Sequence, residues 1–372
     1  MSDRLLVATR KGLFILQRSS GGQWELAQTH FLGEPLSMAF ADPRDGTLYA
    51  ALNLGHFGVK LWRRPAAQVD WQACAVPVYP PQPESTEPPP APVEGQPPPA
   101  PWSLQQIWAL ESGGADQPGV LWAGTIPGGL FRSADGGDSW SLNRPLWDQP
   151  SRSQWLGGGY DAPGIHSICV DPRDSRHLSV AISCGGVWQS HDAGASWRCT
   201  SSGMFATYMP PELREEGTVQ DPHRMVSCPA QPDALWVQHH NGIFRSTDGA
   251  EHWQEVPAQP SSFGFAVVVH PREPDTAWFV PAVKDECRVP VEARFLVSRT
   301  RDGGRSFEAL SAGLPASPSY DLIYRHGLDI DASGERLAMG STTGGLWLTE
   351  DGGDQWQCLS AHLPPIYCVR FG

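Results

Sequence analysis

The sequence lacks the features that mark membrane-spanning and exported proteins. It contains no run of about 18 or more apolar residues, the length that a helix needs to cross a bilayer, so no transmembrane helix is expected. The opening residues, MSDRLLVATRKGLF, have neither the long apolar stretch nor the small-residue cleavage site of a signal peptide. From these features we expect a cytoplasmic protein that has no membrane partner.

Basic residues and paired cysteines are also scarce. Lys and Arg total 27 against 40 Asp and Glu, which gives a formal net charge of −13. Nucleic acids and anionic membranes attract basic surfaces, so neither is an expected partner. The eight cysteines form no C-x-x-C pair, and most stand in apolar strand patterns, as Cys169 does. We expect buried free thiols rather than zinc ligands.

Glycine, proline and tryptophan are abundant instead. The 39 glycines and 36 prolines make up about a fifth of the 372 residues, which is typical of short strands joined by many turns. A tryptophan side chain buries a large apolar area, so 16 of them indicate a structural position for this residue that recurs along the chain. This composition favours a repeat fold.

Self-comparison reveals the repeat. Five segments fit the pattern S/T-x-D-x-G/A-x-x-W/F: SADGGDSW, SHDAGASW, STDGAEHW, TRDGGRSF and TEDGGDQW. Their aspartates are Asp135, Asp192, Asp248, Asp302 and Asp351, so successive copies lie 57, 56, 54 and 49 residues apart. This spacing fits one four-stranded unit per copy.

The pattern resembles the Asp-box, or BNR repeat, of sialidases and other β-propeller families. The resemblance implies a structural role for the box, in which the Asp carboxylate and the Ser or Thr hydroxyl accept backbone N–H groups of a hairpin turn. The glycine adopts a backbone conformation that other residues avoid, and the aromatic residue starts the next strand. The five box aspartates are therefore expected to be neither catalytic nor metal-binding.

Two degenerate copies complete the set. Residues 5–26 and 36–74 have the strand pattern with Trp24 and Trp71, but they lack the aspartate. The sequence thus predicts an all-β fold, a seven-bladed β-propeller with four-stranded antiparallel blades, which forms one domain over residues 1–372. The C-terminal segment 366–372 should complete the first blade and remove its open edge.

One segment does not fit the repeat. Residues 77–101 are rich in proline and nearly free of apolar side chains. They are expected to form an extended, flexible insertion between blades 2 and 3.

Candidate functional residues gather in the connections that reach the mouth of the central channel, the face on which propellers usually carry function. Three of these connections are long, at 141–164, 201–222 and 312–324, and each leads into a histidine. The candidate ligand-binding residues are Trp155, Tyr160, His166, His223, Arg224, His240, Arg325 and His326. The candidate catalytic carboxylates are Asp161, Glu212 and Asp221.

Two chemistries suit these residues. His166, His223 and His326 could hold a divalent transition metal beside the carboxylates, although the sequence requires no cofactor. The same imidazoles could act in general acid–base catalysis, with Arg224 and Arg325 as clamps for an anion. In the plainest alternative, each histidine only satisfies hydrogen bonds within the channel.

Three functions remain open. The first is a glycosyl hydrolase-like enzyme with a small-molecule or carbohydrate ligand. Sialidases carry an R-I-P motif that this chain lacks, so it does not resemble a typical sialidase. Xyloglucanases of the Asp-box type use two tandem propellers, whereas this sequence predicts one. The second is a non-catalytic ligand- or protein-binding scaffold, similar to the photosystem II assembly propellers. The third is a metal-dependent hydrolase or lyase. A monomer is expected for each.

Overall fold

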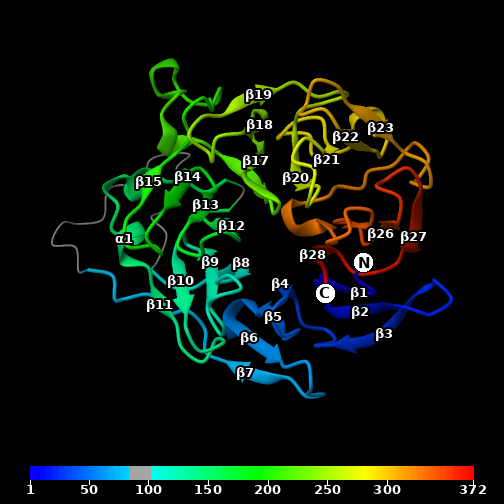
Figure 1. Ribbon diagram of the computed structural model, residues 1–372, viewed down its shortest axis with the longest axis horizontal. Coiled ribbons are helices and arrows are strands. Elements are labelled where there is room, and N and C mark those ends of the chain that lie inside the picture. Colours follow the sequence, from blue (N-terminus) through cyan, green and yellow to red (C-terminus); the bar gives the residue numbers. More distant parts are fainter. Residues whose placement is uncertain (84–101, 159) are drawn as a thin grey trace.

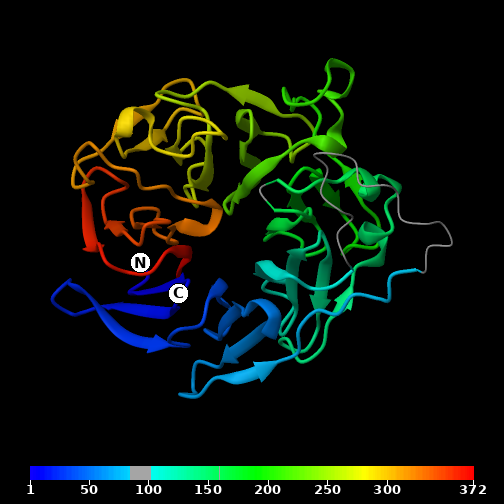
Figure 2. The same ribbon diagram turned by 180° about the vertical axis from the view of Figure 1, so that it is seen from behind.

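Seven four-stranded antiparallel sheets form a ring around a central channel in the computed structural model, which describes residues 1–83, 102–158 and 160–372 (Figure 1). The predicted seven-bladed β-propeller is confirmed, and the view from behind shows the same closed ring (Figure 2). None of the helices in these described parts has the length and hydrophobicity to span a bilayer.

Each blade runs from an innermost strand at the channel to an outermost strand at the rim. The first four blades are, from the inside outward, β28 (Ile366–Phe371), β1 (Arg4–Thr9), β2 (Gly12–Arg18) and β3 (Trp24–His30); β4 (Leu36–Ala41), β5 (Leu48–Asn53), β6 (Val59–Arg64) and β7 (Gln72–Cys74); β8 (Gln106–Ser112), β9 (Leu121–Ile126), β10 (Leu130–Ser133) and β11 (Ser141–Leu142); and β12 (Ile165–Val170), β13 (Leu178–Ile182), β14 (Gly186–Ser190) and β15 (Arg198–Cys199).

The other three blades have the same order. They are β16 (Pro222–Cys228), β17 (Gln231–His239), β18 (Gly242–Ser246) and β19 (Gln254–Val256); β20 (Gly264–Val269), β21 (Ala277–Pro281), β22 (Val297–Thr300) and β23 (Glu308–Leu310); and β24 (Leu328–Ile330), β25 (Leu337–Gly340), β26 (Leu346–Thr349) and β27 (Trp356–Ser360). The short helices lie in connections: α1 (Arg144–Trp147), η1 (Gly55–Phe57), η2 (Pro150–Gln154), η3 (Pro211–Leu213), η4 (Gly217–Val219), η5 (Val291–Ala293) and η6 (Arg325–Gly327).

The C-terminal strand closes the ring, as predicted. β28 pairs antiparallel with β1, with Leu5 opposite Phe371 and Val7 opposite Val369. The Arg10 backbone N–H also donates to the Pro365 carbonyl at 2.9 Å. The first blade therefore draws its innermost strand from the end of the chain, and the ring presents no open sheet edge there.

The core lies between neighbouring blades. Strands such as β9 and β20 are buried at every position because each is covered by a sheet on both sides. This explains their near-continuous apolar sequences, LWAGTI and GFAVVV, which do not alternate as a half-exposed strand would.

An aromatic residue stands at or just before the start of every outermost strand. These residues are Trp24, Trp71, Trp140, Trp197, Trp253, Phe307 and Trp356. Four of the indole N–H groups donate to the adjacent blade: Trp24 to Glu350 Oε1 at 3.3 Å, Trp140 to the Ala75 carbonyl at 3.0 Å, Trp197 to Asn143 Oδ1 at 2.9 Å and Trp253 to the Thr200 carbonyl at 2.7 Å. The recurring aromatic position thus joins adjacent blades.

The five repeated turns share one hydrogen-bond pattern. In the turn after β14, Ser190 Oγ accepts the Gly194 N–H at 2.8 Å and donates to Asp192 Oδ1 at 2.8 Å. Asp192 Oδ1 in turn accepts the Ser196 N–H at 2.8 Å. Gly194 has a φ of +85°, a conformation that is strained for residues with a Cβ. These aspartates satisfy backbone groups, as their predicted structural role requires.

The predicted Pro-rich insertion begins with an ordered stretch. Of residues 77–101, the segment 84–101 lies outside the described residues. Tyr79 in the described part is buried, and its ring packs against Phe131 and Trp147 at 5.0 and 4.9 Å between centroids. The prediction of a flexible insertion from residue 77 is therefore wrong for its first residues, because Tyr79 anchors them on blade 3.

We predict that Ser190→Ala lowers the free energy of unfolding by about 1–2 kcal/mol, because it removes the acceptor of the buried Gly194 N–H. Urea denaturation of the purified protein measures this change. Ser202→Ala, at an exposed position, is the matched control and should change stability by less than about 0.5 kcal/mol. Equal effects of the two substitutions would contradict the role given to the turn.

Stability should also fall at acidic pH. Hydrogen bonds from the hydroxyls of Ser139, Ser196 and Ser306 lower the pKa values of Asp135, Asp192 and Asp302 to about 2. An unfolded Asp has a pKa of about 3.9, so the stabilisation is fully present above pH about 4 and is lost as the pH falls through about 2. Melting temperatures measured from pH 6 to pH 2 test this, and a flat profile would contradict it.

Candidate functional site

A cavity of about 610 Å³ opens at the channel mouth, and all seven blades contribute residues to its wall. Turns between the second and third strands of the blades supply Arg10, Cys184 and His240. Connections between successive blades supply others, among them Tyr208 and Tyr324. Both kinds of connection therefore meet on this face of the ring.

A β-bulge near the start of six innermost strands positions part of the wall. In β8, for example, Ile107 pairs with Thr125 and Ala109 with Gly124, so Trp108 is an extra residue without a pairing partner. The same irregularity falls at Ser37, Trp108, His166, His223, Phe265 and Tyr367. A bulge redirects a side chain that the regular alternation would place between sheets. All of these residues except His166 line the cavity.

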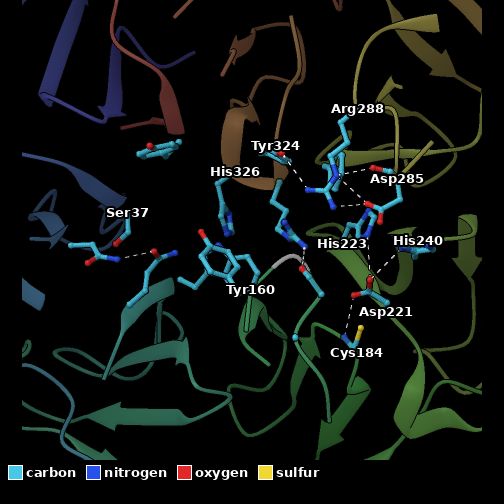
Figure 3. Close-up of a pocket in the computed structure, with 18 of the residues that line it drawn as sticks. Ser37, Tyr160, Cys184, Asp221, His223, His240, Asp285, Arg288, Tyr324 and His326 are labelled. Atoms are coloured by element: carbon cyan, nitrogen blue, oxygen red, sulfur yellow. Dashed lines mark hydrogen bonds and ion pairs between the residues drawn. The ribbon is translucent and has the colours of Figure 1, made fainter. Parts of the chain in front are cut away.

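Asp221 lies at one side of the cavity, just before β16, and its side chain is almost fully buried (Figure 3). Its Oδ1 accepts the Cys184 N–H at 3.1 Å and the Ser183 hydroxyl at 3.4 Å. Its Oδ2 faces His223 Nε2 at 3.4 Å and His240 Nδ1 at 3.5 Å. Burial raises the pKa of Asp221, but the contacts with both imidazoles outweigh burial and hold it well below its usual value.

The two histidines beside Asp221 have different surroundings. His223 is buried, its Nδ1 donates to the Gly264 carbonyl at 2.7 Å, and its ring stacks on Phe265 with 4.6 Å between centroids. Burial lowers the pKa of His223. His240 is more open, with 24% of its side chain exposed. Burial also lowers its pKa, but Asp221 outweighs burial and the net pKa is raised.

Two arginines bring positive charge to the same wall. The Arg325 guanidinium lies 4.6 Å from the centre of the Trp108 ring, and its Nη2 donates to the Gly158 carbonyl at 3.4 Å. Arg288 pairs with Asp285, with 2.6 Å between Nη2 and Oδ1. The wall thus combines fixed cations, carboxylates and aromatic rings, which can orient a polar ligand.

Several predicted site residues do not reach the cavity. Asp161 and Glu212 are exposed and do not line it, so the three predicted carboxylates are not brought together. Trp155 belongs to the apolar core and packs against Trp188, with 5.8 Å between centroids. Arg224 donates to the His166 carbonyl at 3.1 Å, deeper in the channel. Tyr160, His223, His240, Arg325 and His326 line the cavity, as does Asp221.

The predicted metal set of His166, His223 and His326 is not assembled either. Both ring nitrogens of His166 are used, since Nε2 donates to the Pro222 carbonyl at 2.7 Å and Nδ1 accepts the Ser167 hydroxyl at 2.9 Å. Among the described residues, the group that could hold a metal ion is Asp221, His223 and His240, whose ligand atoms lie within 4.8 Å of one another.

Sequence reasoning missed several lining residues, namely Trp108, Tyr208, Phe265, Arg288 and Tyr324. A usable signal existed for two of them. Trp108 and Phe265 stand at the bulge of an innermost strand, the position that His166 and His223 occupy in their own blades. Aligning the blades at this position would have found both residues.

Comparison with known proteins places the chain near glycosyl hydrolase propellers. It is 31% identical over 149 residues to a Paenibacillus xyloglucanase, which covers 37% of this chain and 14% of the relative. It is 25% identical over 285 residues to a probable oligoxyloglucan-reducing end-specific xyloglucanase of Neosartorya fischeri, which covers 69% of this chain and 32% of the relative. The chain thus spans about a third or less of the length of these relatives. No family model matches the sequence.

Solved structures share the fold at low sequence identity. An ancestral GH74 enzyme superposes with a TM-score of 0.57 at 15% identity, covering 87% of this chain and 38% of that one. A protein of unknown function from Desulfotomaculum acetoxidans gives a TM-score of 0.57 at 12% identity, covering 99% of this chain and 98% of that one. YCF48 bound to D1 peptide gives 0.51 at 14% identity, covering 87% and 81%. The chain is therefore a seven-bladed propeller similar in fold and in part of its sequence to glycosyl hydrolases.

We predict that His166→Ala lowers the free energy of unfolding by about 2–3 kcal/mol, because the buried Pro222 carbonyl and Ser167 hydroxyl lose their partner. Urea denaturation measures the change. His56→Ala, at an exposed position, should leave stability nearly unaltered. If His166→Ala lowered stability as little as His56→Ala does, the hydrogen bonds of the His166 ring would not contribute to stability as predicted.

Proposed function

We propose that this chain is a glycosyl hydrolase-like propeller that binds a short carbohydrate in the channel-mouth cavity. The observation that carries the proposal is the make-up of the cavity wall, where exposed tyrosine rings and a few convergent polar groups surround about 610 Å³. Pockets of about 300–1,000 Å³ with this combination take ligands of small-molecule size. The partial sequence similarity to xyloglucanases supports a sugar as the ligand.

The wall offers aromatic rings for the apolar face of a sugar and polar groups for its hydroxyls. Tyr160 and Tyr367 line the cavity and keep 46% and 37% of their surfaces exposed, so their rings can pack against the apolar face of a sugar. Two amide side chains lie in the same wall, and the bond of 3.1 Å from Asn53 Nδ2 to Gln106 Oε1 fixes their orientation beside a bound sugar. Arg10 adds a cationic donor.

A two-carboxylate glycosidase mechanism has less support than binding. Among the described residues that line the cavity, the carboxylates are Asp221 and Asp285. Asp285 pairs with Arg288, and Asp221 accepts an N–H and faces two imidazoles, so both carboxylates already have ionic or hydrogen-bonding partners. Such a mechanism requires one carboxyl to carry a proton. Catalysis at this site would therefore use an acid other than a protonated carboxyl. The alternative function is ligand binding without turnover.

The proposal predicts sugar affinity at the channel mouth. Xyloglucan and cello-oligosaccharides titrated into the purified chain should bind, as measured by calorimetry. Tyr160→Ala and Tyr367→Ala should each weaken binding about 3- to 10-fold, the loss of one stacking contact of about 0.5–1.5 kcal/mol. Tyr320→Ala is the matched control, because Tyr320 is 62% exposed and does not line the cavity.

Two outcomes would contradict the proposal. One is that no oligosaccharide of the panel binds to the folded chain. The other is that Tyr320→Ala weakens binding as much as the cavity substitutions do. Chromatography of the same mixtures for cleaved sugars separates the two forms of the proposal, since turnover supports a hydrolase and binding alone supports a ligand-binding scaffold.

A further inference from the structure

We propose that Asp221, His223 and His240 form a binding site for one divalent transition-metal ion that faces the channel-mouth cavity (Figure 3). The site goes beyond the proposed sugar binding and does not depend on it. It rests on the arrangement of lone pairs, the spacing of the ligand atoms and the groups that hold the ligands in place.

The first step concerns the proton on His223. Its Nδ1 lies 2.7 Å from the Gly264 carbonyl, and a carbonyl can only accept, so Nδ1 carries the hydrogen. In the neutral ring Nε2 is then a lone pair, and it faces Asp221 Oδ2 at 3.4 Å. Two buried acceptors that point at each other repel, so the contact between His223 and Asp221 is favourable only when a proton or a metal ion lies between Nε2 and Oδ2. A metal ion satisfies both acceptors.

The second step concerns spacing. His240 Nδ1 lies 3.5 Å from the same Oδ2, and all three ligand atoms fall within 4.8 Å of one another. An ion with tetrahedral bonds of about 2.0–2.1 Å separates its ligand atoms by about 3.3–3.4 Å, close to the two distances observed. Three protein ligands leave the fourth position for water or a ligand atom, and all three residues line the cavity.

The third step concerns the groups behind the ligands, which in metal sites fix the orientation of each donor. The Gly264 carbonyl sets the tautomer of His223, and Phe265 stacks on its ring. The Cys184 N–H occupies Asp221 Oδ1 and leaves Oδ2 for the ion.

Close approach of the backbone holds the carboxylate further. A Cβ at Gly158 would lie only 2.8 Å from Asp221 Oδ1, so a glycine is needed beside this carboxylate. The Asp221 carbonyl accepts the His240 N–H at 2.9 Å, which ties two of the ligand residues together through the backbone. The ligand set is therefore held by both side-chain and backbone contacts before any ion arrives.

The donor set indicates the class of ion. Two imidazoles and one carboxylate suit Zn²⁺, Fe²⁺, Co²⁺ or Mn²⁺ better than Ca²⁺ or Mg²⁺, which prefer all-oxygen sites. An ion here would face the same cavity as Tyr208 and Arg325. It could therefore polarise a bound ligand or lower the pKa of a bound water.

Zn²⁺ titrated into the full chain after chelator treatment tests the site. We expect one ion per chain by calorimetry and by elemental analysis, together with a higher melting temperature. Co²⁺ should give visible absorption bands of a four-coordinate site. His240→Ala, at a partly exposed position, and Asp221→Asn, which preserves shape, should each weaken Zn²⁺ binding at least about 100-fold.

His252→Ala is the matched control. His252 and Asp248 form an exposed histidine–carboxylate pair, with 2.8 Å between Nδ1 and Oδ2, so this substitution reports surface binding. It should leave the stoichiometric Zn²⁺ affinity unchanged. Absence of stoichiometric binding by the folded chain would overturn the site, and so would binding that survives both His240→Ala and Asp221→Asn.

The state of His223 gives a second measurement. Nitrogen-15 NMR at neutral pH should show a neutral ring protonated at Nδ1, whose Nε2 resonance shifts when Zn²⁺ is added. A doubly protonated ring that does not respond to Zn²⁺ would overturn the site, because a proton would then fill the place of the ion. Oligosaccharide titration of the chelator-treated chain tests the sugar proposal separately. Failure to bind Zn²⁺ would therefore contradict the metal site without contradicting sugar binding.

Discussion

Side chains near the channel end of the innermost strands have to point at the axis, and the bulge in six of these strands makes them do so. Regular alternation would place each of these residues between two sheets. The extra residue turns one side chain per blade toward the channel instead. The bulge is nearly constant around the ring, but the residue at the bulge differs between blades, for example Ser37, Trp108 and His223. The chemistry of the mouth can therefore change from blade to blade without any change in the fold.

Deeper in the channel, polar groups take the place of an apolar core. Glu111 and Asp329 approach Arg224 and Arg370, and burial raises the pKa values of both carboxyls against the effect of these arginines. Arg370 Nη2 lies 3.3 Å from Nδ1 of His326, which lines the cavity above. The candidate site thus lies above a layer of partly buried charged side chains. These charges contribute to the electrostatic potential at the mouth, in addition to the groups that line it.

The number of blades and the closure of the ring could be predicted because both depend on local features that recur. Each turn satisfies its own backbone within a few residues, and Trp197 marks an outermost strand by its position alone. The candidate site was only partly predictable because its contacts cross between blades. His166 and His223 occupy the same position of neighbouring blades, yet the Pro222 carbonyl engages one ring and Asp221 faces the other. Asp221 and Pro222 are adjacent in the sequence, and the histidine that each one contacts depends on how the neighbouring blades pack, so strand patterns could not distinguish the two histidines.

Closure of the ring by β28 also bears on how the molecule folds. The pair of Val7 and Val369 joins residues that are 362 positions apart, so the entropy cost of pairing β28 with β1 is high compared with that of pairing consecutive strands. Blades built from consecutive strands can form from local contacts, whereas the first blade has to await the last strand. Arg10 and Tyr367 meet in the cavity wall only after that step. The cavity at the channel mouth is therefore among the last parts of the molecule to assemble, because a chain without the β28–β1 pairing lacks part of its wall.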